Sequence, residues 1–269
     1  MGGKNAQIGF YYQNLFTVLK IIEGLQAGNL LSVKIEQEIK DSGKKEMDII
    51  LESENKHFEF YEIKSGQCFG DSPSDIKATI KKFHKIHLCK QDGATYKYYL
   101  IINPEYLPSI LEIKLKLQKI IKRKKGHKRA AQQIAAECHI ADWRSLWNFL
   151  QETEIRAEIK LDKLKKLCNA EIKGIVEKLV MNADHGLETL DLLNRLLSCI
   201  NDCLIFKDGV IDLSLFTKHI IEWTARNRLI SQIPRGGVDV ETSLIKERTF
   251  VSGRIKSIFP NIESVIGVL

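Results

Sequence analysis

Hydrophobic positions recur at helical spacing in the first part of the chain and then alternate with polar positions at strand spacing. The helical spacing predicts a long helix over residues 5–27. The alternation predicts a strand over residues 32–40 and then a β-hairpin whose turn is centred near Asn55. A helix over residues 74–90 and an apolar strand over residues 96–103 follow. The order predicts an α/β fold with a mixed sheet, because hairpin strands are antiparallel and a helical crossover returns a parallel strand.

From residue 104 onward the apolar positions repeat mainly at helical spacing, and the last 35 residues are expected to be more irregular. Residues 155–161 fit either a short strand or an extended link. The sequence therefore predicts a mixed sheet flanked by helices over residues 1–108 and a mostly helical region over residues 109–269. The helices expected in the second region cover residues 108–125, 127–138, a segment capped by Asp142, 161–182, 186–205 and 212–230.

Composition narrows the class of protein only slightly. The chain has 269 residues, of which 44% are apolar, so it can build one large domain or two small ones. The net charge of +7 fits a polyanionic partner. No apolar run reaches the length that spans a bilayer, and the N-terminus lacks the pattern of a signal peptide, so we expect a cytoplasmic location.

The predicted hairpin brings two acids and a lysine together. With the turn near Asn55, Asp48 lies across from Glu62, and Lys64 shares the strand face of Glu62. Carboxylates this close repel each other unless a cation lies between them, so the pattern predicts a divalent-metal site. The alternative is an ordinary ion pair between Glu62 and Lys64.

The order Glu38, Asp48, Glu62-x-Lys64 resembles the motif of the PD-(D/E)xK restriction-endonuclease-like nucleases over roughly residues 5–104. The resemblance implies a restriction-endonuclease-like fold and Mg²⁺, or Mn²⁺, as the cofactor. It implies that Lys64 positions or deprotonates an attacking water and stabilises the charge of the transition state. The metal ligands that the resemblance implies are Asp48, Glu62, Glu38 and the backbone carbonyl of Ile63.

A narrower resemblance adds a fifth side chain. Gly9-Phe-Tyr-Tyr-Gln13, Tyr-Glu62-Ile-Lys64 and Tyr-Leu-Ile-Ile-Asn103 are similar to the double-stranded-DNA endonuclease domain of bacterial antiphage effectors of the CBASS and Lamassu types. That family implies that Gln13 lies near the active site. Whether Glu36 or Glu38 is the third acid stays open.

Two basic segments are candidates for contacts with the phosphate backbone of duplex DNA. The first is the helix that follows the hairpin, and the second is the basic run that ends the first helix of the C-terminal region. For the basic run, a solvated helix face is the alternative. The candidate residues are Lys77, Lys81, Lys82, Lys85, Lys122, Arg123, Lys124 and Lys125.

Taken together, the patterns and resemblances predict an Mg²⁺-dependent DNA endonuclease, an enzyme that hydrolyses phosphodiesters as the regulated effector of an antiphage complex. The helical region would form homo-oligomers or dock regulatory subunits, of which an SMC-like ATPase is one type. A catalytically inactive nuclease-like subunit for DNA binding or assembly is the alternative. A structural helical adaptor is a third possibility.

Overall fold

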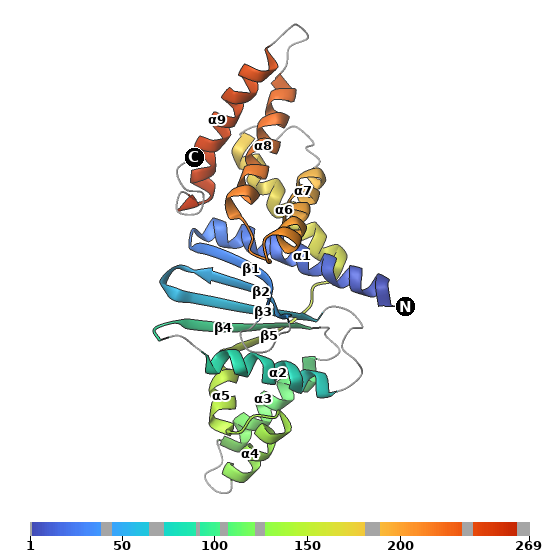
Figure 1. Ribbon diagram of the computed structural model, residues 1–269, viewed down its shortest axis with the longest axis vertical. Coiled ribbons are helices and arrows are strands. Elements are labelled where there is room, and N and C mark those ends of the chain that lie inside the picture. The colour runs from blue at the N-terminus through green and yellow to red at the C-terminus, as the bar shows by residue number, and fades with distance from the viewer. Residues whose placement is uncertain are drawn as a thin grey trace. The chain divides into compact units, whose positions relative to one another are not determined.

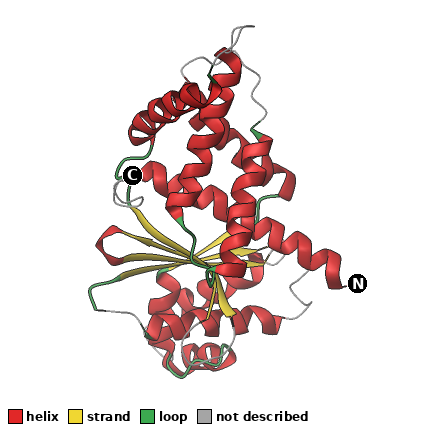
Figure 2. Ribbon diagram, turned by 45° about the horizontal axis from the view of Figure 1, so that its top comes forward, coloured by secondary structure: helices red, strands yellow, loops and turns green. Residues whose placement is uncertain are grey.

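The computed structural model has the mixed α/β architecture that the sequence predicts (Figures 1 and 2). It describes residues 2–38, 45–64, 73–89, 92–102, 107–121, 127–180, 189–232 and 239–262. The strands are β1 (Leu30–Glu38), β2 (Lys45–Ser53), β3 (His57–Lys64), β4 (Thr95–Ile102) and β5 (Thr153–Ala157). The helices are α1 (Gly2–Ala27), η1 (Glu54–Lys56), α2 (Pro73–Leu88), α3 (Leu107–Ile121), α4 (His127–Glu137), α5 (Trp143–Gln151), α6 (Leu161–Val180), α7 (Leu190–Phe206), α8 (Leu213–Gln232) and α9 (Val240–Ile258).

The sheet is mixed, and its strands follow the order β1-β2-β3-β4-β5. β2 and β3 pair antiparallel with Ile49 opposite Tyr61, and the turn between them holds Asn55 in the left-handed region with φ 59°. Asparagine tolerates that conformation better than most residues, which explains how the sequence marks this turn. β3 and β4 pair in parallel, as do β4 and β5. Residues 155–161 fitted either a strand or an extended link at the level of the sequence. Residues 155–157 of this segment belong to β5 and are therefore a strand.

The chain separates into two compact units. One comprises Met1–Gln13 and Glu36–Ile159, and the other comprises Asn14–Ile35 and Lys160–Leu269. The first unit thus extends beyond residue 108 and includes α3, which begins at Leu107, together with α4, α5 and β5. The predicted boundary between residues 108 and 109 stays a prediction.

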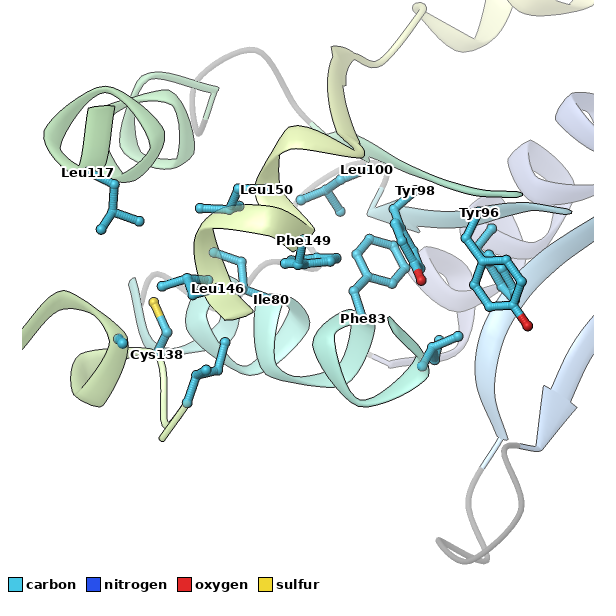
Figure 3. Close-up of a cluster of buried hydrophobic side chains, with 14 of the residues drawn as sticks. Ile80, Phe83, Tyr96, Tyr98, Leu100, Leu117, Cys138, Leu146, Phe149 and Leu150 are labelled. Atoms are coloured by element: carbon cyan, nitrogen blue, oxygen red, sulfur yellow. The ribbon is translucent and has the colours of Figure 1, made fainter. Parts of the chain in front are cut away.

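An aromatic cluster holds α2, α3, α4 and α5 on one face of the sheet (Figure 3). Phe60 of β3 stacks on Tyr98 of β4, with ring centroids 5.4 Å apart. Phe83 of α2 and Phe149 of α5 pack on the same tyrosine at 5.6 and 5.2 Å. Each aromatic pair adds about 0.5–1.5 kcal/mol beyond the burial of its area. Because Phe60 and Glu62 share a strand face, this packing brings α2 over the face that carries Glu62.

The second unit contains a helix that the sequence analysis did not predict. Residues 240–258, expected to be irregular, form α9. Asp239 caps it, because its side chain accepts hydrogen bonds from the N–H groups of Glu241 and Thr242. Only Val251 and Ile255 of the helix are buried. A helix that buries so few side chains needs little apolar periodicity, which explains why the sequence pattern did not predict it. The Pro-Arg-Gly-Gly sequence before it is also typical of a break in regular structure, although it lies outside the described residues.

A short bridge in the same unit covers part of β1. Lys34 pairs antiparallel with Val210, in the turn between α7 and α8. The N–H of Ile35 donates to the carbonyl of Gly209 over 2.8 Å, and the N–H of Ile211 donates to the carbonyl of Val33 over 2.9 Å. These bonds satisfy backbone groups that a bare strand edge leaves unpaired.

Candidate functional site

Glu62, near the end of β3, is the most buried charged residue that the first unit brings to this face, with 1% of its side chain exposed. Its Oε1 accepts from Lys64 Nζ over 2.6 Å, and its Oε2 accepts from Lys82 Nζ over 2.6 Å. A carboxylate is costly to bury unless it is paired and hydrogen-bonded. The ion pair with Lys64, which was the alternative at the level of the sequence, is present, and α2 supplies a second ammonium group.

Asp48 lies beside this pair on β2. The register that sets Ile49 opposite Tyr61 brings Asp48 opposite Glu62 at the next position along the strands. Its Oδ2 accepts a hydrogen bond from the N–H of Ile63 over 2.6 Å. Burial, and next the negative charge of Glu62, raise the pKa of the Asp48 carboxyl to about 7. The Ile63 N–H and the two lysines oppose that shift. We call Asp48, Glu62, Lys64 and Lys82 the Glu62 cluster.

The oxygens of the Glu62 cluster fit a small, hard cation. Mg²⁺ binds through one or two carboxylates and keeps several waters, so Asp48 and Glu62 suffice as protein ligands. A cation would also offset the burial and the repulsion by Glu62 that together raise the pKa of Asp48. Among the described residues, no group of three or more His, Cys, Asp or Glu side chains is placed to hold a metal. The remaining ligands would have to be water, the Ile63 carbonyl or oxygens of a bound molecule.

The third acid stays open. Glu38 is the last residue of β1, but its side chain lies outside what the structure describes. Glu36 is half-buried and has a φ of 47°. Gln13 is half-buried on α1, and its place near the site stays a prediction.

The predicted phosphate-contacting lysines separate into different environments. Lys82 joins the Glu62 cluster, whereas Lys77 pairs with Glu137 of α4 over 3.3 Å. Lys81 and Lys85 are exposed on the same helix. The four basic residues at positions 122–125 lie outside the described residues. From the sequence, Lys82 was a candidate contact to the phosphate backbone of DNA. Its contact with Glu62 depends on how α2 packs and cannot be found from spacing along the chain.

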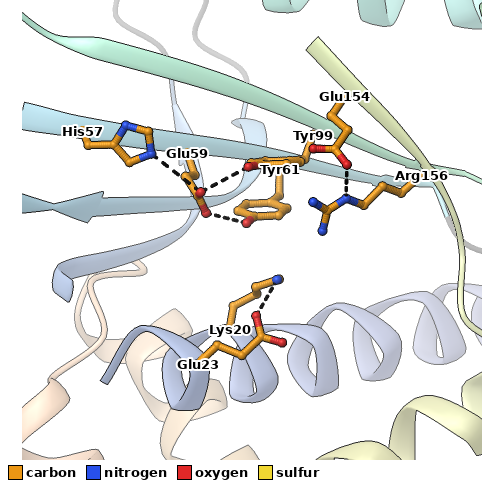
Figure 4. A network of polar contacts seen from close by, with 8 residues as sticks. All are labelled: Lys20, Glu23, His57, Glu59, Tyr61, Tyr99, Glu154 and Arg156. Atoms are coloured by element: carbon orange, nitrogen blue, oxygen red, sulfur yellow. Dashed lines mark hydrogen bonds and ion pairs between the residues drawn. The ribbon is translucent and has the colours of Figure 1, made fainter. Parts of the chain in front are cut away.

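A second polar network lies on the opposite face of β3 and β4, and the sequence analysis did not identify it (Figure 4). Glu59 accepts hydrogen bonds from the hydroxyl groups of Tyr61 and Tyr99 over 2.5 and 3.2 Å. Burial and Glu59 raise the pKa of Tyr99 to about 12. The guanidinium of Arg156 lies over the Tyr99 ring at 4.8 Å. Two stacked tyrosines that share one carboxylate are best explained as sheet-stabilising contacts.

An open depression of about 490 Å³ lies at the amino ends of β4 and β5, away from the end of β3 that carries Glu62. No member of the Glu62 cluster contributes to it. Its lining residues are Thr95, Tyr96, Lys97, Tyr99, Lys114, Gln151, Glu152, Thr153 and Glu154. The candidate metal and phosphate chemistry therefore belongs to the Glu62 cluster and not to this depression.

Comparison with known proteins gives similarity to solved structures only. No protein-family model matches the chain, and no curated protein does. One similar structure is the Acinetobacter baumannii Cap4 SAVED/CARF-domain containing receptor with the cyclic trinucleotide 3′3′3′-cAAA. It has 14% sequence identity and a TM-score of 0.47, and the match covers 82% of this chain and 49% of that one.

Two further receptor structures match at similar levels. The Acinetobacter baumannii Cap4 receptor, in a structure whose name includes no nucleotide, has 15% identity and a TM-score of 0.47, with coverage of 93% and 61%. The Moraxella osloensis Cap4 SAVED/CARF-domain containing receptor has 14% identity and a TM-score of 0.45, with coverage of 94% and 62%. This chain thus spans about half to three-fifths of the length of these receptors.

These similarities correct two interpretations drawn from the sequence. The resemblance to a PD-(D/E)xK nuclease domain and the function of a double-stranded-DNA endonuclease are both contradicted, because the similar structures are named as SAVED/CARF-domain receptors. One of them is named with a cyclic trinucleotide, and a further structure of the Acinetobacter baumannii receptor is named with the cyclic trinucleotide 2′3′3′-cAAA. The physical reason for the error is that acids and a lysine at strand spacing specify a local cluster of charge. They do not specify the molecule that the cluster binds.

The sequence predicted no segment that spans a bilayer. In the described part of the chain, no helix is both long enough and apolar enough to cross a membrane.

Proposed function

We propose that the Glu62 cluster is a Mg²⁺-dependent site for a nucleotide phosphodiester, and that the chain hydrolyses this ester. One observation carries the proposal: two lysines from different elements converge on both oxygens of a buried glutamate that faces a second acid. This arrangement offers oxygens for a cation and ammonium groups for a phosphate within one cluster.

The residues of the cluster have separate tasks in this proposal. Asp48 and Glu62 hold the cation, and the N–H of Ile63 fixes the orientation of Asp48. Lys64 and Lys82 provide charge-assisted hydrogen bonds to phosphate oxygens, and these strengthen as negative charge develops on them. The bound cation supplies Lewis acidity and lowers the pKa of a water.

The biological setting is part of the same proposal. We place the site in antiviral defence of the CBASS type. Control by separate regulatory subunits and assembly into homo-oligomers also remain predictions. The ligand is proposed as a nucleotide because two ammonium groups suit a phosphodiester.

The test measures cation binding and ester hydrolysis with the full chain. Calorimetry with Mg²⁺ compares the wild type with Asp48→Asn and with Glu137→Gln, a control in which an exposed acid that pairs with Lys77 is changed. Hydrolysis of bis(p-nitrophenyl) phosphate is followed in the same three proteins. We expect Asp48→Asn to lose both activities and Glu137→Gln to keep them.

Two results would overturn the proposal. One is the absence of millimolar or tighter Mg²⁺ binding by the wild type, and the other is hydrolysis that does not change in Asp48→Asn. The cyclic trinucleotides 3′3′3′-cAAA and 2′3′3′-cAAA, named as ligands of the similar receptors, are tested in parallel. Binding of either one without hydrolysis, unaffected by Asp48→Asn, would indicate a ligand-sensing receptor in place of a hydrolase.

A further inference from the structure

Both oxygens of the Glu62 carboxylate are already occupied by ammonium groups. Lys64 lies 2.6 Å from Oε1, and Lys82 lies 2.6 Å from Oε2. A single lysine is enough to neutralise one carboxylate, so the two lysines balance Glu62 and an ionised Asp48, and a divalent cation added to the cluster would leave a surplus of positive charge. A divalent cation that approaches Glu62 meets both a like charge and an occupied ligand atom.

The two lysines differ in how they are attached. Lys64 stands two residues from Glu62 on the same strand face, so the backbone of β3 keeps the two side chains together. Lys82 projects from α2, where the neighbouring Phe83 anchors the helix in the aromatic cluster. Its flexible four-carbon stem can turn toward solvent while the helix stays in place. The side chain is 21% exposed, so that path is open.

We propose that Lys82 is an internal counter-ion of Glu62, which a divalent cation displaces and which then contacts the phosphate of the bound ligand. This inference rests on the proposed function, because it assigns a positioning role within the same site. Cation and phosphate binding are then coupled. Each of them favours the state in which Lys82 has left Glu62, and coupling of this kind is reciprocal.

The coupling is measured by titrating the full chain with Mg²⁺ in the absence and presence of saturating inorganic phosphate. For the wild type, we expect phosphate to lower the Kd for Mg²⁺ by about fivefold or more. In Lys82→Met, Mg²⁺ alone should bind more tightly than to the wild type, and phosphate should lower its Kd by less than in the wild type, since Lys64 still contacts the phosphate. Lys81→Met is the matched control, since Lys81 is the exposed neighbour on the same helix, and it should keep the wild-type coupling.

A second variant, Lys82→Arg, tests the same role if Lys82→Met does not fold. Lys82→Arg keeps the charge and can bind Glu62 with a bidentate pair, so it should weaken the binding of Mg²⁺ alone. Circular dichroism melting curves establish that each variant is folded before it is titrated.

The outcomes separate the two proposals. Wild-type protein that fails to bind Mg²⁺ overturns both of them. Wild-type protein that binds Mg²⁺ without any effect of phosphate, or coupling that is undiminished in Lys82→Met, overturns the role of Lys82 and leaves the proposed function intact. Coupling that is reduced in Lys82→Met and keeps its wild-type size in Lys81→Met supports the inference.

Discussion

The N–H of Ile63 donates a hydrogen bond to Oδ2 of Asp48 over 2.6 Å, and so joins the backbone of β3 to a side chain of β2. This bond orients the Asp48 carboxyl beside Glu62, its partner in the register of the hairpin. It also opposes the rise in the pKa of Asp48 that burial and the charge of Glu62 cause. The pKa of Asp48 therefore depends on the other members of the Glu62 cluster.

The pKa of Asp48 predicts how stability varies with pH. Its ordinary value of 3.8 rises to about 7 in the folded chain, first by burial and then by Glu62. Between about pH 4 and pH 7 the folded state therefore binds more protons than the unfolded state, so stability falls as the pH rises. This contribution is complete below the unfolded pKa and is lost as the pH rises through the folded pKa.

Asp48→Asn should remove this dependence, because Asn keeps the acceptor for the Ile63 N–H and never ionises. In EDTA at pH 8 the variant should be more stable than the wild type by on the order of 1 kcal/mol or more, and at pH 5, where the wild type has lost only part of this contribution, the difference should be smaller. Urea unfolding at both pH values measures the difference. A wild type that gains stability from pH 5 to pH 8 relative to the variant would reverse the sign and contradict the account.

Mg²⁺ should stabilise the wild type at pH 8, because a ligand that binds only the folded state raises the free energy of unfolding. At a free concentration 100-fold above Kd the gain is about 2.7 kcal/mol. Thermal melts with Mg²⁺ and with EDTA measure it, and Asp48→Asn should show no shift. An equal shift in both proteins would mean that the cation binds elsewhere.

Glu62→Gln should destabilise the chain by about 1–3 kcal/mol, because two ammonium groups lose the charge that they share. Glu154→Gln is the matched control: Glu154 is 55% exposed and pairs with Arg156 on the surface, where a salt bridge contributes about 0–1 kcal/mol. Urea unfolding compares the two variants with the wild type. If Glu62→Gln costs no more than Glu154→Gln, the burial of the cluster is of little energetic consequence.

Phe149→Ala should cost about 3–5 kcal/mol, since its ring is fully buried against Tyr98 and leaves a cavity. Phe149→Leu fills more of that space and should cost less. Because the same aromatic cluster anchors α2, the alanine variant should also show faster hydrogen exchange in α2 than the leucine variant. Equal hydrogen exchange of α2 in the two variants would mean that the packing of Phe149 on α5 does not hold α2, and with it Lys82, in place.

Asp239→Ala should cost about 0.5–2 kcal/mol, because the N–H groups of Glu241 and Thr242 lose their acceptor at the start of α9. Lys246→Ala, an exposed change within the same helix, serves as the control and should be close to neutral. Chemical denaturation distinguishes the two variants. Equal values would show that the cap contributes nothing.

The sequence by itself determined the features that depend on local geometry. Asn55 marks a turn that any hairpin with alternating strands needs, and that turn sets the register that brings Asp48 opposite Glu62. Lys64 shares a face with Glu62 because side chains repeat every second residue along a strand. The mixed sheet follows from the order of the elements, and the sequence predicted it correctly.

Only the tertiary structure decided which distant residues complete the cluster. Lys82 reaches Glu62 because Phe83, its neighbour on α2, packs on Tyr98 of another strand, and no spacing along the chain encodes that contact. β5 joins the sheet by pairing with β4. The weak strand pattern of its five residues does not predict that pairing. Local periodicity follows from the geometry of one element, whereas contacts between elements depend on how their side chains pack together.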